Sequence, residues 1–211
     1  MKFFHSPGSC SLASHVAIEE TGAAYESVKV TVGDKSNQKP EYLKINPRGF
    51  VPALAVDDWV MSENAAIMLF LAHSFPDAKL LPQNPRALAK CLEWLEWQTN
   101  TAHINFAMLW RAERFVDSPA DHKIVQDAGT IRIRKRLAEI EAWLAGNEFA
   151  AGPVYSVADG MFLVLYRWGW RAGEQVDATT FPHWTAYIKR LSERPAIKRV
   201  LQQEAIALLA G

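Results

Sequence analysis

The sequence has 211 residues, of which 23 are Lys or Arg and 23 are Asp or Glu, so its formal net charge is zero. With 49% hydrophobic and 22% charged residues, the composition is typical of a globular protein and excludes a disordered or collagen-like chain. It lacks the basic excess of a nucleic-acid binder. The longest apolar run, near Met161–Tyr166, is far shorter than the ~20 residues of a membrane span, so we expect neither nucleic acid nor membrane as a partner.

The N-terminus does not predict a secretion signal, because the polar and turn-forming segment His5–Gly8 interrupts the short apolar start. The two cysteines, Cys10 and Cys91, lie in a loop-like and a helical context. This arrangement favours two independent thiols in a reducing compartment. We therefore expect a cytoplasmic protein.

The first part of the chain predicts short strands alternating with helices. In chain order we expect a strand at Lys2–His5, a helix at Cys10–Glu20, strands at Tyr25–Val32, Val51–Val56 and Trp59–Met61, and a helix from Ser62 or Asn64 to Ser74. With a helical connection before the last strand pair, this order predicts a small α/β layer.

A change of character follows a proline-rich segment. Three prolines between Pro76 and Pro85 predict a linker at residues 77–85, which separates a domain at 1–76 from one at 86–211. The second domain predicts helices only, at Arg86–Phe115, Asp121–Leu144, Ser156–Arg171 and His183–Glu193, the last ending at Arg194-Pro195. Seven of the eight tryptophans lie here, so its core should be large and aromatic.

The first segment that can carry chemistry is Ser9-Cys10-Ser11, which follows Pro7-Gly8 and opens a helix. The N-terminus of a helix exposes unpaired N–H groups and a partial positive charge. A thiol at this position ionises more readily, and an anionic sulfur of a ligand is also stabilised. The structural alternative is a small buried cysteine under the helix.

The second segment is Asn46–Leu54, in which Pro52 precedes a strand. If the Val51-Pro52 bond is cis, the N–H and C=O of Val51 point outward, where an extended peptide can pair with them. The third is Ser62-Glu63-Asn64, before a helix. Ser and Asn here can be simple N-caps, or Glu63 can bind a ligand ammonium while the helix N-terminus holds a carboxylate.

These three segments together resemble the N-terminal, thioredoxin-like domain of cytosolic glutathione S-transferases, the bacterial beta class in particular. Ser156-Val157-Ala158-Asp159 is similar to the helix-capping box of that family's C-terminal domain, in which the Ser hydroxyl and the Asp carboxylate each take one helical or pre-helical N–H. The resemblance implies the glutathione transferase fold: an α/β thioredoxin-like N-terminal domain and an all-α C-terminal domain.

The resemblance also implies residue roles. Cys10 matches the cysteine beside the glutathione sulfur, and His103 the histidine of the catalytic site. Matched to glutathione binding are Ser11, Lys35, Val51, Pro52, Glu63, Asn64, Glu96 and Asn100. The candidates for the second-substrate pocket are His5, Phe106, Trp110, Arg111 and Trp168, with Met108 and Arg114 on the same segment.

Two positions depart from the family pattern. Glu96 stands where the family has Asn, and Ile104 where it has Lys. At helical spacing Glu96, Asn100 and His103 share one face, so we expect the carboxylate to favour protonated His103. The same exchange makes this face less favourable for an anionic tripeptide.

Three functions remain open. The leading one is a glutathione transferase that joins the glutathione thiolate to an apolar electrophile, with no permanent cofactor and as a homodimer by resemblance. The second is a glutathione-dependent thiol–disulfide oxidoreductase working through a Cys10 mixed disulfide. The third is a non-catalytic binding protein on the same fold. No cluster of His, Cys and Asp has metal-ligand spacing in the sequence, so no metal is expected.

Overall fold

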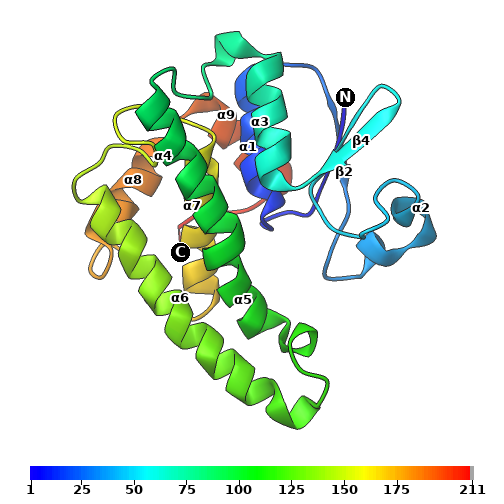
Figure 1. The fold of residues 1–211 in the computed structure, drawn as a ribbon, viewed down its shortest axis with the longest axis vertical. Coiled ribbons are helices and arrows are strands. Elements are labelled where there is room, and N and C mark those ends of the chain that lie inside the picture. The colour runs from blue at the N-terminus through cyan, green and yellow to red at the C-terminus, as the bar shows by residue number, and fades with distance from the viewer. Residues whose placement is uncertain (210–211) are drawn as a thin grey trace.

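The computed structural model describes residues 1–209. Figure 1 shows a small sheet with its covering helices on one side and a larger group of helices on the other. The elements of the first part are β1 (Lys2–His5), α1 (Ser11–Thr21), β2 (Glu26–Lys29), η1 (Ser36–Gln38), α2 (Pro40–Leu43), β3 (Ala53–Val56), β4 (Trp59–Ser62), α3 (Asn64–Ser74) and η2 (Pro76–Ala78). The predicted α/β layer is confirmed.

The sheet has the order β2-β1-β3-β4. β1 pairs with β2 in parallel and with β3 in antiparallel, and β3 and β4 form an antiparallel hairpin. α1 and α3 pack against each other, and the buried residues of α1, among them Leu12, Val16 and Ile18, belong to the main hydrophobic core. Gly22 ends α1 with φ +68°, a left-handed conformation that glycine adopts without a steric penalty.

The second part of the described chain is helical. Its helices are α4 (Pro85–Glu96), α5 (His103–Trp110), α6 (His122–Leu144), α7 (Ala158–Arg171), α8 (Pro182–Ser192) and α9 (Pro195–Glu204), with short 3-10 turns η4 (Ala112–Arg114) and η5 (Pro119–Asp121). α5 and α6 lie side by side (Figure 1). α7 is buried along most of its length, with Met161, Phe162 and Tyr166 in the core, and it packs on α1 together with α9.

Two predictions of the helical part were wrong. The single helix expected at Arg86–Phe115 is broken by η3, a π-helical segment at Trp97–Ala102, and ends at Trp110. The prediction that the last helix stops at Arg194-Pro195 missed α9, which begins at Pro195. Proline is favoured in the first turn of a helix because its missing N–H would be unpaired there in any case, so the same residue ends one helix and starts the next.

The Ser156–Asp159 box is formed in part. The Asp159 carboxylate accepts the N–H of Ser156 at 2.7 Å, as expected. The Ser156 hydroxyl, however, donates to Asp159 at 3.2 Å instead of capping a helical N–H. Asp159 also accepts from the N–H of Ala150 and the hydroxyl of Tyr187, so it joins three segments of the helical core.

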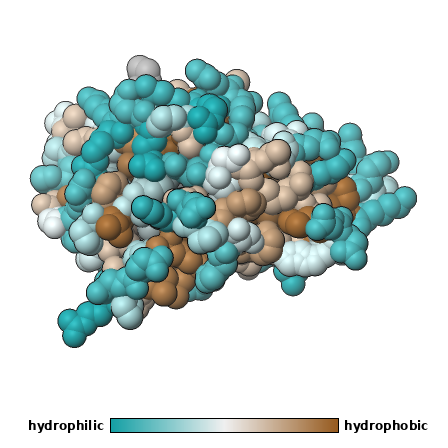
Figure 2. All heavy atoms as spheres, turned by 90° about the horizontal axis from the view of Figure 1, so that it is seen from above, coloured by the Kyte–Doolittle hydropathy of each residue, from teal (hydrophilic) through white to brown (hydrophobic). Residues whose placement is uncertain are grey.

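Hydrophilic side chains cover most of the face shown in Figure 2, and apolar ones gather in separate patches. None of the helices of residues 1–209 combines the length and the hydropathy that crossing a membrane requires.

Candidate functional site

A cleft of about 750 Å³ lies between the start of α1 and the helices α5 and α7, a size typical of small-molecule sites. Both parts of the chain contribute to it. The N-terminal wall comes from residues 7–10, 32–33, 37, 50–52 and 62–64, and the helical wall from residues on η3, α5, the 111–114 turn and α7. Of the predicted site residues, the cleft brings together Cys10, Val51, Pro52, Glu63, Asn64, His103, Phe106, Trp110, Arg111 and Trp168.

The main chain of Val51 faces this cleft. The Val51-Pro52 bond is cis, and the carbonyl of the preceding Phe50 accepts bonds from the Tyr42 hydroxyl at 2.6 Å and the Asn46 amide at 2.8 Å. The N–H of Val51 has no partner among residues 1–209, and its carbonyl accepts only the thiol of Cys10 at 3.6 Å. Both polar groups are therefore available to an extended ligand.

The start of α3 forms the next part of the wall. Glu63 occupies the N-cap position with φ +76° and makes no side-chain cap, and its carboxylate lies 3.6 Å from the Arg48 guanidinium. Asn64 is buried and accepts the Ser14 hydroxyl at 2.6 Å. Ser62 and Asn64 therefore do not serve as N-caps. A positive φ in a residue other than glycine is uncommon and concentrates at functional sites.

Cys10 immediately precedes α1 and lines the cleft. Burial raises the pKa of its thiol to about 11, although hydrogen bonds from Asn64 and the main chain partly offset that effect. The expectation that the helix N-terminus lowers this pKa was wrong, because the desolvation of the thiolate outweighs the partial charge of the helix.

Ser11 lies outside the cleft. Its hydroxyl is buried and donates to the carbonyl of Ser6 at 3.2 Å, while the N–H of Ser6 donates back to it at 3.1 Å. Ser9, 2.8 Å from Ser11 between hydroxyl oxygens, is the serine of this segment that lines the cleft.

The helical wall is aromatic. The ring of Trp168 lies 5.2 Å from that of His103, 5.4 Å from Phe106 and 5.4 Å from Trp110, between centroids. Burial, together with the charge of Arg114, lowers the pKa of His103. The expectation of a protonated His103 was therefore wrong, because burial favours the neutral imidazole.

The predicted face of Glu96, Asn100 and His103 is not formed. The amide of Asn100 donates to the carboxylate of Glu96 at 2.6 Å on the exposed surface, and neither residue lines the cleft. The π-helical turn between them and His103 adds residues to each turn, so the spacing that aligns the three on an α-helix no longer does so. Lys35 does not line the cleft either. It lies at the N-cap position of η1 with φ 60°, and from this loop Val32, Gly33 and Asn37 line the cleft instead.

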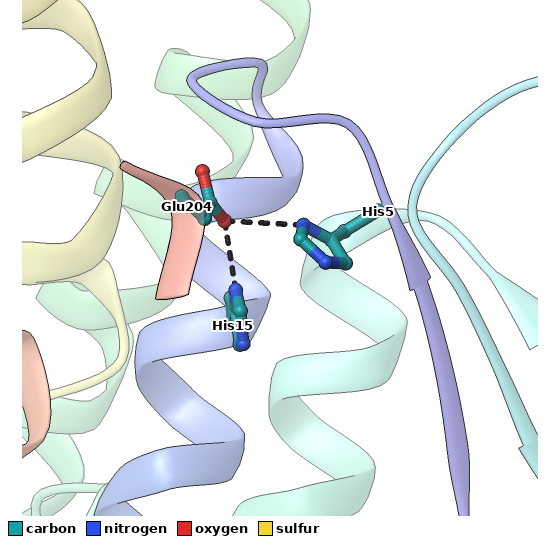
Figure 3. A group of neighbouring side chains, drawn as sticks. All are labelled: His5, His15 and Glu204. Carbon is teal, nitrogen blue, oxygen red and sulfur yellow. Dashed lines mark hydrogen bonds and ion pairs between the residues drawn. The ribbon is translucent and has the colours of Figure 1, made fainter. Parts of the chain in front are cut away.

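His5 is not a pocket residue. It is buried, donates to or accepts from the Ser27 hydroxyl at 2.9 Å, and stacks on Phe3. Figure 3 shows it facing Glu204 from α9 and His15 from α1. Nδ1 of His15 lies 2.7 Å and Nδ1 of His5 3.4 Å from the same Glu204 oxygen, Oε1.

These three side chains form a cluster with metal-ligating groups that the sequence spacing did not reveal. The ligand atoms lie within 4.8 Å of one another. Two ligands of a tetrahedral ion with ~2.1 Å bonds stand about 3.4 Å apart, whereas His15 and Glu204 approach to 2.7 Å. The cluster therefore fits a direct hydrogen bond between these two residues, not an ion between them.

Glu204 also acts on the cleft through Gly8. The N–H of Gly8 donates to Glu204 Oε2 at 2.7 Å. The carbonyl of Gly8 accepts the indole N–H of Trp168 at 2.9 Å and the guanidinium of Arg167 at 3.3 Å. We call these contacts the Gly8 clamp. Sequence reasoning missed Glu204 and Arg167, since residues 196 and 159 positions from Gly8 share no local pattern with it.

Comparison with known proteins decides the family. Residues 1–73 match the family described as Glutathione S-transferase, N-terminal domain, and residues 100–195 match Glutathione S-transferase, C-terminal domain. Glutathione S-transferase GstA of Escherichia coli O157:H7 is 32% identical over 98% of this chain and 100% of its own. The chain belongs to the glutathione S-transferase family.

Solved structures of other family members agree with this assignment. A sphingomonad glutathione S-transferase complexed with glutathione has a TM-score of 0.84 and 33% identity, with 98% of this chain and 100% of that chain covered. The beta class glutathione S-transferase of Sphingomonas chungbukensis has a TM-score of 0.82, 33% identity and the same coverage. This glutathione S-transferase is most similar to the bacterial beta class, as the sequence motifs predicted.

Proposed function

We propose that the protein conjugates the thiolate of reduced glutathione to electrophilic substrates in the cleft described above. One observation supports this function most directly: the main chain of Val51, whose N–H has no partner within residues 1–209, and the start of α3 lie in the same 750 Å³ cleft. An extended tripeptide with an α-amino acid at one end matches both.

In this proposal glutathione lies along the N-terminal wall. Its cysteinyl main chain pairs with the N–H and C=O of Val51. The ammonium of its γ-glutamyl end meets the carboxylate of Glu63, and the α-carboxylate meets the N-terminus of α3 at Asn64. Lys35, Glu96 and Asn100 have no part in this arrangement, because none of them lines the cleft.

The glutathione sulfur then lies near the start of α1. The Ser9 hydroxyl and the neutral Cys10 thiol are donors on this side, and donors aimed at a thiolate lower its pKa. The thiolate attacks the electrophilic carbon, a carbon–sulfur bond forms, and the leaving group departs with its electron pair. Because burial keeps Cys10 protonated, it serves as a donor and not as a nucleophile, which favours conjugation over a mixed-disulfide route.

The electrophile lies against the aromatic rings of His103, Phe106, Trp110 and Trp168. A cytoplasmic location, a role in detoxification and a homodimer stay predictions. The exposed Phe50, Trp59 and Val60, at 48%, 42% and 44% of their surfaces, are apolar groups of the N-terminal part that a second copy can cover.

Calorimetric titration with reduced glutathione tests the binding mode. We expect Glu63→Gln to weaken binding by about tenfold or more, because the ligand ammonium loses a charged partner. Glu41→Gln, an exposed glutamate on α2 outside the cleft, should leave the affinity unchanged. No binding at millimolar glutathione, or equal affinity for both variants, contradicts the proposed site.

A further inference from the structure

The cleft is lined by more positively charged than negatively charged side chains. Arg111, Arg114, Arg167 and Arg171 line it, whereas the one acidic lining residue is Glu63, already beside Arg48. Within residues 1–209, none of the four guanidinium groups has a carboxylate within 4.0 Å. In a chain of zero net charge, this places a concentrated positive potential in one concave site.

Two of the four arginines have structural contacts. Arg167 is 9% exposed and donates to the carbonyls of Gly8 and Ala207. Arg114 lies over the ring of Phe50, 5.5 Å from its centroid, and so spans the cleft from the helical wall to the N-terminal wall. Both guanidinium groups are held by these neighbours.

Most of the N–H donors of Arg111 and Arg171 have no hydrogen-bond partner within residues 1–209. Arg111 donates one bond, to the carbonyl of Trp110 at 2.9 Å. Arg171 makes no hydrogen bond within residues 1–209 and is exposed; its nearest aromatic contact is Trp170, at 6.0 Å. A guanidinium has five N–H donors in a planar fork that matches a carboxylate.

These two arginines flank a pair of tryptophans. Arg111 directly follows Trp110 on α5, and Arg171 is three residues, nearly one turn, after Trp168 on α7. The two tryptophan rings meet edge to face at 5.4 Å. The helical wall thus offers an apolar aromatic surface with one cation just after the end of α5 and one at the end of α7.

We propose that the second substrate is an aromatic carboxylate, whose ring lies against Trp110 and Trp168 and whose carboxylate binds Arg111 and Arg171. This inference rests on the proposed function and narrows the substrate from apolar electrophiles in general to anionic ones. The glutathione sulfur attacks the ring carbon that bears a halide, the carbon–sulfur bond forms, and halide leaves with its electron pair. The carboxylate takes no part in the bond changes.

A matched pair of substrates separates the charge from the chemistry. 4-Chloro-3,5-dinitrobenzoate and its methyl ester share the same reacting carbon and differ in the negative charge. After correction for the uncatalysed rates, we expect kcat/KM to favour the acid by about tenfold, the size of one charge-assisted contact. Arg111→Gln and Arg171→Gln should each lower kcat/KM for the acid more than for the ester and so remove most of that preference.

Arg86→Gln provides the matched control. Arg86 is an exposed arginine at the start of α4, outside the cleft, so its substitution changes the net charge equally and should keep the acid preference. Equal rates for acid and ester, or an equal loss in all three variants, overturn the inference. So does a loss of affinity for glutathione in the Arg111 and Arg171 variants that matches the loss for the acid, because the arginines then serve glutathione.

Calorimetric titration keeps the test independent of turnover. If neither substrate reacts, the proposed function fails, and the binding of 3,5-dinitrobenzoate against its methyl ester still tests the arginines. Tighter binding of the acid by about tenfold, lost in Arg111→Gln and kept in Arg86→Gln, supports the anion site. Equal binding of acid and ester contradicts it.

Discussion

The two walls of the cleft are built in different ways. The N-terminal wall presents the main-chain groups of Val51, a backbone at Gly8 that the clamp holds in place, and the side chain of Glu63, whose φ is +76°. The helical wall presents side chains, four aromatic rings and four arginines, on regular helices and their ends. The conformation of the backbone determines the first wall, and the choice of side chains determines the second.

This difference separates what each wall can change. A site made of main-chain groups depends on the backbone conformation and not on the identity of its side chains. Such a site can therefore bind the same ligand after many substitutions, as long as the backbone conformation is preserved. The exposed side chains of a helical wall can be altered one residue at a time at little cost to the fold. Substitutions that disturb the support of the N-terminal wall should therefore lower stability, whereas substitutions in the helical wall should change selectivity.

The largest effect is expected at Glu204, which supports the N-terminal wall from α9. Glu204→Gln removes a buried charge from His15 and from the N–H of Gly8, and we expect a loss of about 3 kcal/mol in the free energy of unfolding. Urea denaturation measures it. The control is Glu193→Gln, an exposed partner of Lys198, which should change stability by less than about 0.5 kcal/mol.

The same residue gives a pH dependence. Burial opposes the Glu204 charge, but hydrogen bonds from His15, His5 and Gly8 outweigh it, so the folded-state pKa is lowered. The unfolded chain then binds the proton more tightly than the folded one. The stabilisation is complete above the unfolded value of about 4.3 and is lost as the pH falls through the lower folded pKa. Glu204→Gln should flatten that decline; an unchanged slope contradicts this role.

The next effect compares two glycines with the same backbone angle. Gly8 and Gly22 both have φ +68°, but a Cβ on Gly8 meets the guanidinium of Arg167 at 2.6 Å, whereas one on Gly22 meets nothing within 4 Å. We expect Gly22→Ala to cost about 1 kcal/mol for the left-handed backbone alone. Gly8→Ala should cost about 2 kcal/mol, because Arg167 must also give up its two carbonyl contacts. Equal costs show that the clamp contributes nothing.

The smallest effect is expected at Cys10, in the N-terminal wall but with no part in its support. With a pKa of about 11, about one thiol in 10⁴ is ionised at pH 7, so alkylation by iodoacetamide should be slow and still accelerate above pH 9. Cys10→Ala should lower conjugation by less than about tenfold. A plateau in the alkylation rate below pH 8, or complete loss of activity, shows that Cys10 acts as a thiolate.

Sequence alone predicted the parts of the site that local patterns encode. The segment around Val51-Pro52 and the Glu63-Asn64 pair lie in the cleft, as predicted. Each could be predicted because its conformation depends on a turn that a few neighbouring residues specify. The period of the apolar residues predicted the helices, as at Ile133, Leu137 and Ile140, all buried on α6, whereas the resemblance to the family implied the glutathione transferase fold.

The rest depended on contacts that no local pattern records. The π-helical turn before His103 shifts the residues after it around the helix axis, although the sequence pattern predicts one continuous α-helix. The prediction that His103 shares a face with Glu96 and Asn100 was therefore wrong. The free energy of ionising Cys10 depends on burial by segments distant in sequence. The cluster of His5 and His15 is completed by Glu204, which lies 189 positions after His15. The sequence pattern did not predict α9, because a proline marks the end of one helix as readily as the start of another, and Pro195 does both.

The Gly8 clamp has a consequence for how the protein folds. The N–H of Gly8 and Nδ1 of His15 find their buried partner in Glu204, which follows them by 196 and 189 positions in the chain. Until Glu204 reaches them, these groups must stay in water, since buried donors without partners are costly. The N-terminal wall of the cleft is thus completed only when α9 docks on α1, although the main-chain groups that we propose bind the ligand there precede α9 in the chain.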